Sequence, residues 1–87
     1  MTNFKQIELS EMLFENLKNQ FSELELVNIT ESVENPDHIW VNIIMPEDED
    51  REIEIREAAS EISTNILLEY GYHITISSAT GLEKNTA

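Results

Sequence analysis

The chain has 87 residues, of which 18 are Asp or Glu and five are Lys or Arg, so its formal net charge at pH 7 is −13. This length predicts one domain with a modest core. The charge argues against direct nucleic-acid binding, because affinity for a phosphate backbone comes from Lys and Arg contacts. The absence of cysteine excludes disulfides, thiolate metal sites and cysteine nucleophiles.

Two further absences in the sequence bear on where the protein works. No apolar run is long enough to cross a bilayer, so we expect no membrane partner. The first residues do not have the pattern of a signal peptide, so we expect a cytoplasmic protein.

Residues 3–20 are predicted to form the first helix. Its apolar residues recur at the four-residue spacing of one helix face, and they are Leu9, Leu13, Leu17 and Phe21, with Ile7 and Phe14 widening the stripe. Gln6 and Ser10 interrupt the stripe, so a shorter helix with Ser10 as its N-cap is the alternative.

Two strands are predicted to follow as a hairpin. In residues 22–30, Leu24 and Leu26 share one parity whereas Val27 and Ile29 share the other, which predicts either a bulge or partial cover on both faces. After a turn at Asn35-Pro36-Asp37, residues 38–45 alternate regularly. One face of this second strand carries Ile39, Val41, Ile43 and Met45, and the other carries His38, Trp40, Asn42 and Ile44.

A long helix is predicted to begin near Pro46, in its first turn, and to end at Gly71. One stripe of this helix is apolar and consists of Ile55, Ala59, Ile62 and Ile66. A second row, about 140° around the helix from the first, consists of four carboxylates that we call the acidic ridge: Asp50, Glu54, Glu57 and Glu61. The ridge is expected to face solvent.

The remaining sides of the long helix give two weaker expectations. Ser60, Ser63 and Thr64 are small and share one side, which would let another helix approach closely. Leu68 falls near the ridge. We expect it to pack against the neighbouring helix or the chain end, and the alternative is that it belongs to a partner-binding patch.

A third strand is predicted over residues 72–78, with Tyr72, Ile74 and Ile76 facing inward. The predicted fold is therefore α+β: a two-layer α-β-β-α-β sandwich with two helices packed on one face of a three-stranded mixed sheet. Residues 1–78 form this single acidic domain, and residues 79–87 are expected to be a flexible C-terminal tail.

The outer face of the sheet is predicted to be open. If the third strand lies beside the second, Trp40 and His73 share this face, and Trp40 is a candidate anchor for a partner. The alternatives are that the C-terminal tail caps Trp40 or that it packs on the aliphatic stems of its neighbours. The same face offers a route to a homodimer, which the net charge would oppose.

Catalytic and metal sites are not indicated. Ser77, His73 and Asp37 lack the Gly-x-Ser-x-Gly pattern of a nucleophile elbow. The two histidines, His38 and His73, have no further ligand at metal-binding spacing. We therefore expect no cofactor and no enzymatic activity.

The predicted element order is similar to that of type II KH-like domains, including the variant of ribosome-binding factor A in which a kinked helix replaces the glycine loop. This resemblance implies an RNA-binding or ribosome-associated factor. It concerns element order alone, because the only glycines are Gly71 and Gly81 and no Gly-x-x-Gly clamp exists. Ala58-Ala59-Ser60 stands where the kink would fall, and the flanking residues are acidic.

The charge pattern favours a non-catalytic protein-binding module that docks its acidic ridge on a basic partner or mimics a phosphate backbone. The alternatives are a KH-like or ribosome-associated RNA factor and a subunit of an oligomeric ligand binder or enzyme. The charge also has a simpler explanation, which is that it keeps a small protein soluble.

Overall fold

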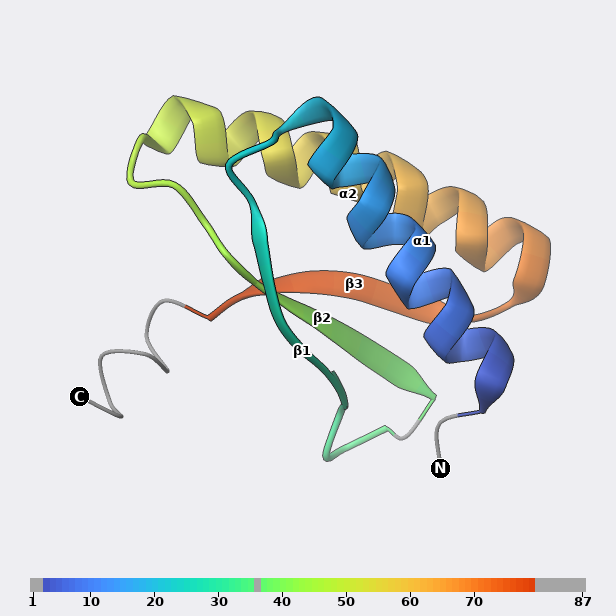
Figure 1. The fold of residues 1–87 in the computed structure, drawn as a ribbon. Helices are drawn as coiled ribbons and strands as arrows, with labels where there is room; N and C mark the ends of the chain where they lie inside the picture. The colour runs from blue at the N-terminus through green and yellow to red at the C-terminus, as the bar shows by residue number, and fades with distance from the viewer. Residues whose placement is uncertain (1–2, 36, 80–87) are drawn as a thin grey trace.

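The computed structural model describes residues 3–35 and 37–79. The elements follow in the order α1 (Phe4–Gln20), β1 (Glu25–Glu31), β2 (His38–Ile44), α2 (Glu49–Tyr70) and β3 (His73–Ser78), as Figure 1 shows. This order confirms the predicted α-β-β-α-β arrangement and the α+β class.

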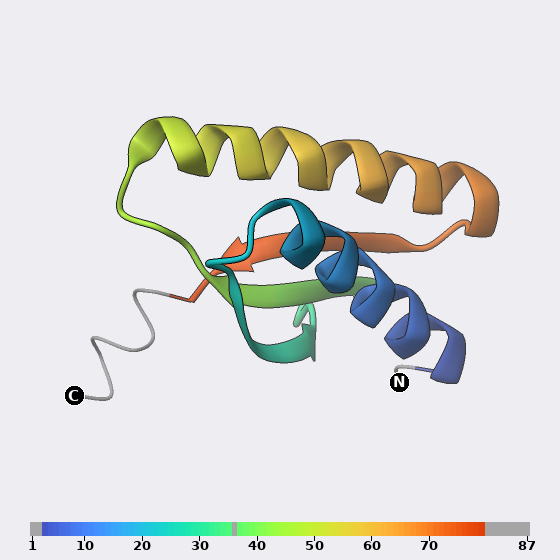
Figure 2. The same cartoon turned by 45° about the horizontal axis from the view of Figure 1, so that its top comes forward.

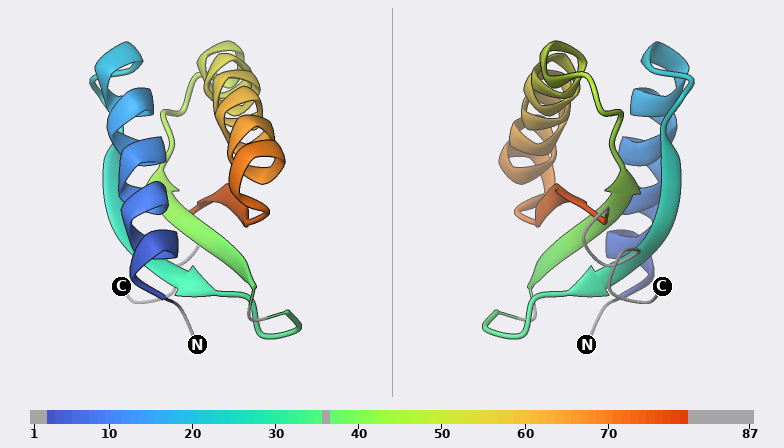
Figure 3. Two further views of the ribbon diagram at one scale, coloured as in Figure 1. Left: turned by 90° about the vertical axis from the view of Figure 1, so that its right-hand side faces the viewer. Right: turned by 90° about the vertical axis from the view of Figure 1, so that its left-hand side faces the viewer.

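The three strands form one mixed sheet in the order β1-β2-β3. β1 runs antiparallel to β2, whereas β3 runs parallel to β2 with His38 opposite His73 and Asn42 opposite Ser77. Both helices lie on the same side of this sheet: α1 lies below α2 and in front of the strands in Figure 2, and beside α2 in the end-on views of Figure 3. The predicted two-layer sandwich is therefore confirmed.

The core lies between the helices and the inner face of the sheet. The predicted apolar faces supply it, because each helix stripe and each alternating strand buries one set of side chains. The largest fully buried apolar side chains are Leu13, Leu17, Leu24, Ile39, Val41, Ile43, Ile55 and Ile74. The assignment of Ile7 to the α1 stripe was wrong, since 40% of its surface is exposed.

The start of α1 is set by a capping box. The Asn3 side chain accepts the Gln6 N–H at 2.8 Å, and the Gln6 side-chain oxygen accepts the Asn3 N–H at 2.9 Å. Ser10 is buried inside the helix, where its hydroxyl donates to the Gln6 carbonyl at 2.7 Å. The alternative start at Ser10 is therefore wrong, because both polar residues find partners locally and do not have to interrupt the helix.

The irregular parity of β1 is explained by a break in its pairing. The register with β2 shifts between Leu26 and Asn28. Leu26 lies opposite Ile43 and Ile29 lies opposite Val41, so the shift places these two residues of different parity on the same face as the buried side chains of β2, as the predicted bulge requires.

The helix α2 begins later than predicted. Asp48 is its N-cap and accepts the Asp50 N–H at 3.0 Å, so the helix starts at Glu49 and Pro46 lies before the cap. The expectation of a proline in the first turn was wrong, because the Asp48 side chain supplies a cap two residues further on. Gly71 closes the helix in the left-handed conformation, with φ of 79°, as predicted.

The described chain continues one residue beyond β3. The Ala79 N–H donates to the Ile43 carbonyl at 2.8 Å, and Ala79 is buried. The rest of the predicted tail, residues 80–87, lies outside the described residues. Within the described part, no helix combines the length and apolar character needed to cross a membrane.

Candidate binding surfaces

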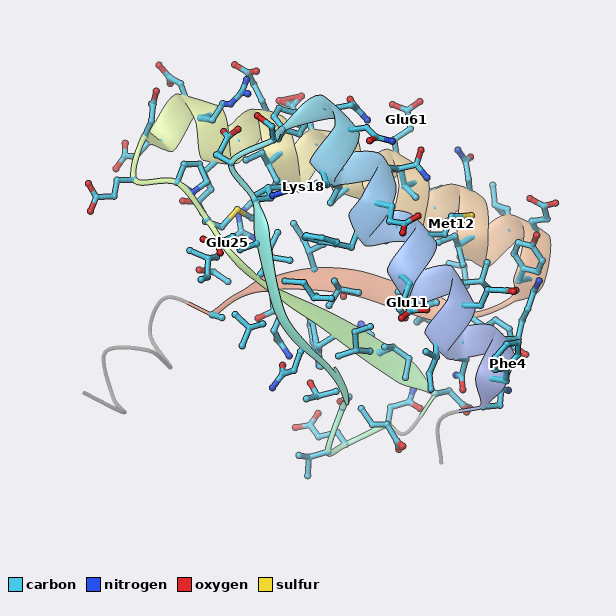
Figure 4. All side chains as sticks on the ribbon, in the orientation of Figure 1. Phe4, Glu11, Met12, Lys18, Glu25 and Glu61 are labelled. Carbon is cyan, nitrogen blue, oxygen red and sulfur yellow. The ribbon has the colours of Figure 1, made fainter. Side chains whose placement is uncertain are left out.

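The acidic ridge lies on the outer side of α2. Asp50, Glu54, Glu57 and Glu61 are all exposed, whereas Ile55 of the same helix is fully buried. Figure 4 shows the Glu61 side chain directed away from the body of the fold. Because α2 rises about 1.5 Å per residue, the four carboxylates span about 16 Å.

In the part of the chain that the structure describes, most of the ridge carboxylates form no salt bridge. Arg51 Nη1 lies 3.6 Å from Glu54 Oε2, and Arg56 pairs at 3.0 Å with Glu52, outside the ridge. Within the described residues, no cation lies within salt-bridge distance of the other three ridge carboxylates. The ridge therefore keeps most of its negative charge available to a partner.

Arg51 connects the first turn of α2 to the segment after α1. Its guanidinium donates to Glu23 Oε2 at 2.7 Å and lies 4.6 Å from the centre of the Phe21 ring. The hydrogen bond from Arg51 lowers the pKa of Glu23, and the same bond raises the pKa of Arg51. Arg51 therefore bonds mainly to Glu23 within the fold and contributes less to neutralising the acidic ridge.

The outer face of the sheet holds the other two predicted site residues. The Trp40 ring is half-buried and stacks on His38, with ring centres 4.5 Å apart. His73 is exposed, and the centre of its ring lies 5.7 Å from that of His38. Trp40 is thus held against His38 on this face, and its role in binding a partner stays a prediction.

Hydrogen bonds bind the same face together across the strands. His38 Nε2 lies 3.0 Å from Thr75 Oγ1, across the pairing of β2 with β3. Asn42 is buried, and its amide donates to Asn28 Oδ1 at 2.7 Å and to Thr30 Oγ1 at 3.0 Å. The candidate residues therefore divide between two surfaces, the ridge on one layer and the Trp40 face on the other.

A groove between α2 and β3 is a third surface, which the sequence did not predict. Its volume is about 270 Å³, and its walls include Ser60, Ser63, Thr64 and Leu67 of α2 and Ile74 and Ile76 of β3. The expectation that these small residues receive another helix was wrong, because they face the edge of the sheet. A row of small side chains on a helix that precedes an edge strand is the signal that could have indicated it.

Leu68 is exposed over 79% of its surface, so the expected packing against the neighbouring helix or chain end was wrong. It lies seven residues after Glu61 and therefore on the same side of α2. The C-terminal continuation of the ridge is thus an exposed apolar side chain, as the partner-patch alternative required.

In the described ranges 3–35 and 37–79, no three His, Asp or Glu side chains gather into a group able to hold a metal ion. In comparisons with known proteins, no protein-family model, curated protein or solved structure matches this chain. The function proposed for it therefore rests on its own residues and surfaces.

Proposed function

We propose that the protein is a non-catalytic binding module that docks its acidic ridge on a basic surface of a partner protein. The observation that carries this proposal is the row of exposed carboxylates on α2, of which Asp50, Glu57 and Glu61 have no cation within salt-bridge distance among the described residues. The proposal includes the expectation that this encounter takes place in the cytoplasm.

Electrostatics support the ridge as a docking surface in two ways. Carboxylates aligned along one face create a directed negative field, which accelerates encounter with a positive surface. The four ridge carboxylates are also exposed to solvent. A partner that covers only part of the ridge leaves the remaining carboxylates hydrated, so no carboxylate is buried without a cation beside it. The groove of a nucleic-acid-binding protein is positively charged, because it binds phosphates through Lys and Arg. Mimicry of a phosphate backbone by the acidic ridge is therefore one form of the proposal.

The RNA-factor alternative receives less support from the same features. The field of a chain with charge −13 repels phosphates. The helix α2 is unbroken from Glu49 to Tyr70 and runs as a single rod in Figure 2, so it lacks the kink that the resemblance to ribosome-binding factor A implies.

The experiment is a pull-down with two variants of equal charge. The ridge variant replaces all four ridge carboxylates by Gln, and the control variant makes the same change at four exposed acids elsewhere, Glu11, Glu15, Glu25 and Glu34. Each variant has net charge −9, compared with −13 for the wild type. At low salt we expect the wild type and the control variant to capture the same proteins and the ridge variant to lose them.

High salt should release the captured proteins, because exposed charges are screened within about 8 Å at physiological ionic strength and over a shorter range above it. Equal losses from both variants would show that only net charge matters. Capture that is insensitive to salt and to both variants would show that another surface binds the partner.

A further inference from the structure

We infer that the groove between α2 and β3 binds a small aliphatic monocarboxylate, with its carboxylate on Arg56 and its hydrocarbon chain along the apolar wall. This inference goes beyond the proposed function, because it assigns a second site and a ligand of different chemistry. The acidic ridge is not part of this site, so either hypothesis can fail without the other.

The lining of the groove differs in charge from the rest of the molecule. Asp and Glu make up 18 of the 87 residues, yet none of the described residues that line the groove is acidic. Arg56 lines the groove and is one of only five Lys or Arg residues in the chain. A negatively charged ligand therefore meets a cation in this wall and no carboxylate.

The Arg56 guanidinium keeps donors for such a ligand. Its Nε donates to Glu52 Oε2 at 3.0 Å, and this guanidinium forms no other bond with the described residues. Its two terminal nitrogens can therefore form a bidentate pair with a carboxylate. Because Glu52 already offsets part of the charge of Arg56, the site suits a ligand with one negative charge better than a dianion such as a phosphate monoester.

Three hydroxyl groups of α2 supply further donors. Ser60, Ser63 and Thr64 line the groove, and none of their hydroxyls bonds to a described residue. In α1, by contrast, the Ser10 hydroxyl donates to a carbonyl of its own helix. Ser60 follows Arg56 by four residues and lies beside it on the helix. Its hydroxyl can therefore donate to the same carboxylate, directly or through a water.

The apolar wall extends from this polar end along the groove. After Gly71 the chain turns, and β3 runs back along α2 (Figure 2). Arg56 and Leu67 border the groove at separate positions on α2, about 16 Å apart along the helix. Leu67 exposes 36% of its surface, which a hydrocarbon chain would remove from water. A molecule with one charged end and one apolar end matches this arrangement.

The size of the groove limits the ligand to a small one. Its volume of about 270 Å³ is below the ~300–1,000 Å³ typical of pockets for drug-sized ligands. The net charge of −13 repels an anion at a distance, but salt at physiological ionic strength screens this repulsion beyond about 8 Å. Contacts inside the groove therefore determine the affinity.

The probe is octanoate, and the matched control is octylammonium, which has the same hydrocarbon chain and the opposite charge. Both are titrated at physiological ionic strength into the ¹⁵N-labelled protein, and amide NMR shifts report where each one binds. We expect octanoate to shift the amides of Ser60, Ser63 and Thr75 in a saturable way. Octylammonium should bind there at least about fivefold more weakly, because it loses its pair with Arg56.

Two substitutions at one ion pair should change the affinity for octanoate in opposite directions. Arg56→Gln should weaken binding at least about fivefold. Glu52→Gln should strengthen it about twofold, because it removes the carboxylate that competes for Arg56. Arg51→Gln is the control, since it makes the same change on the same helix and does not line the groove. It should stay within about twofold of the wild type.

A further pair of variants tests whether the ligand occupies the groove. Ser63→Leu fills it, whereas Asn65→Leu makes an apolar substitution on the same helix outside the lining. Circular dichroism checks that both are folded, and we expect only Ser63→Leu to abolish the saturable shifts. The two probes and Glu52→Gln test the inference even if Ser63→Leu does not fold.

Three results would overturn the inference. The first is the absence of saturable octanoate shifts at the groove amides. The second is binding of octylammonium to these amides as tightly as octanoate, which would mean that the groove selects only the hydrocarbon chain. The third is an equal loss of affinity in Arg56→Gln and Arg51→Gln, which would mean that net charge alone is responsible.

Discussion

Gly71 shows how one residue determines the junction between α2 and β3. Its φ of 79° lies in the left-handed region, and its N–H donates to the Leu67 carbonyl at 2.9 Å to close the helix. A Cβ added at this position would meet no atom within 4 Å. A side chain here is therefore opposed by backbone conformation alone and not by crowding.

Gly71→Ala should lower the free energy of unfolding by about 1–2 kcal/mol, which is the cost of the left-handed conformation for a residue with a Cβ. Gly71→Asn should cost less, because Asn visits this conformation more readily. Urea unfolding followed by circular dichroism measures both variants. An Ala variant as stable as the wild type would show that the turn adopts another conformation.

At the scale of elements, the start of α2 is held to the rest of the fold by Arg51. The contacts of Arg51 with Glu23 and the Phe21 ring join two segments that are 28 residues apart in the sequence, counted from Glu23. Both charged side chains are more than one-third exposed, so solvent and salt screen the pair and its contribution to stability is small. The Arg51–Glu23 pair also affects the acidic ridge. Because Arg51 bonds to Glu23, Glu54 has only a longer contact, 3.6 Å, with the same arginine.

The pair gives a prediction with a definite sign. The folded-state pKa of Glu23 is lowered, first by its hydrogen bond from Arg51. The stability that Glu23 contributes is therefore present above its unfolded-state pKa, about 4.3, and is lost as the pH falls through the lower, folded-state pKa. A carboxyl NMR titration should place the Glu23 midpoint below the usual glutamate value in the wild type.

Arg51→Gln is the matched variant, and it should raise the Glu23 midpoint toward the usual value, because the largest cause of the lowered pKa is removed while a backbone hydrogen bond at Glu23 remains. An Arg51→Gln protein with the same Glu23 midpoint as the wild type would show that the pair does not form in solution.

At the scale of the whole molecule, the net charge of −13 lowers the stability of the folded state through repulsion among the acidic side chains. Only a few carboxylates in the described part of the chain form ion pairs, and these pairs are exposed. Repulsion among the remaining acids therefore outweighs local attraction, and a compact chain concentrates this repulsion.

Added salt should therefore stabilise the protein. Raising NaCl from about 0.01 M to about 0.3 M shortens the screening length from about 30 Å to less than 8 Å, which weakens long-range repulsion more than close pairing. The midpoint of thermal unfolding should rise over this range. The control variant of charge −9 should show a smaller rise, and a fall in the midpoint for the wild type would mean that attractive pairs dominate.

The main expectations that failed have physical reasons in tertiary contacts. Ser10 is polar, yet it is buried because its hydroxyl bonds to the carbonyl of Gln6 within the same helix. Leu68 is apolar, yet 79% of its surface is exposed, because no helix or strand among the described residues covers that side of α2. The groove was not foreseen because it depends on the distance between α2 and β3, which no pattern within either element specifies.

By itself, the sequence determined the element order, the apolar faces, the irregularity in β1 and the exposed row of carboxylates. These features follow from periodicity and local turn chemistry, which act over a few residues. Only the tertiary structure decided that Arg51 turns toward Glu23, that Trp40 stacks on His38, and that small residues of α2 line a groove together with β3. These contacts join residues that are distant in the sequence or lie on different elements, so they exist only once the helices and strands have packed together.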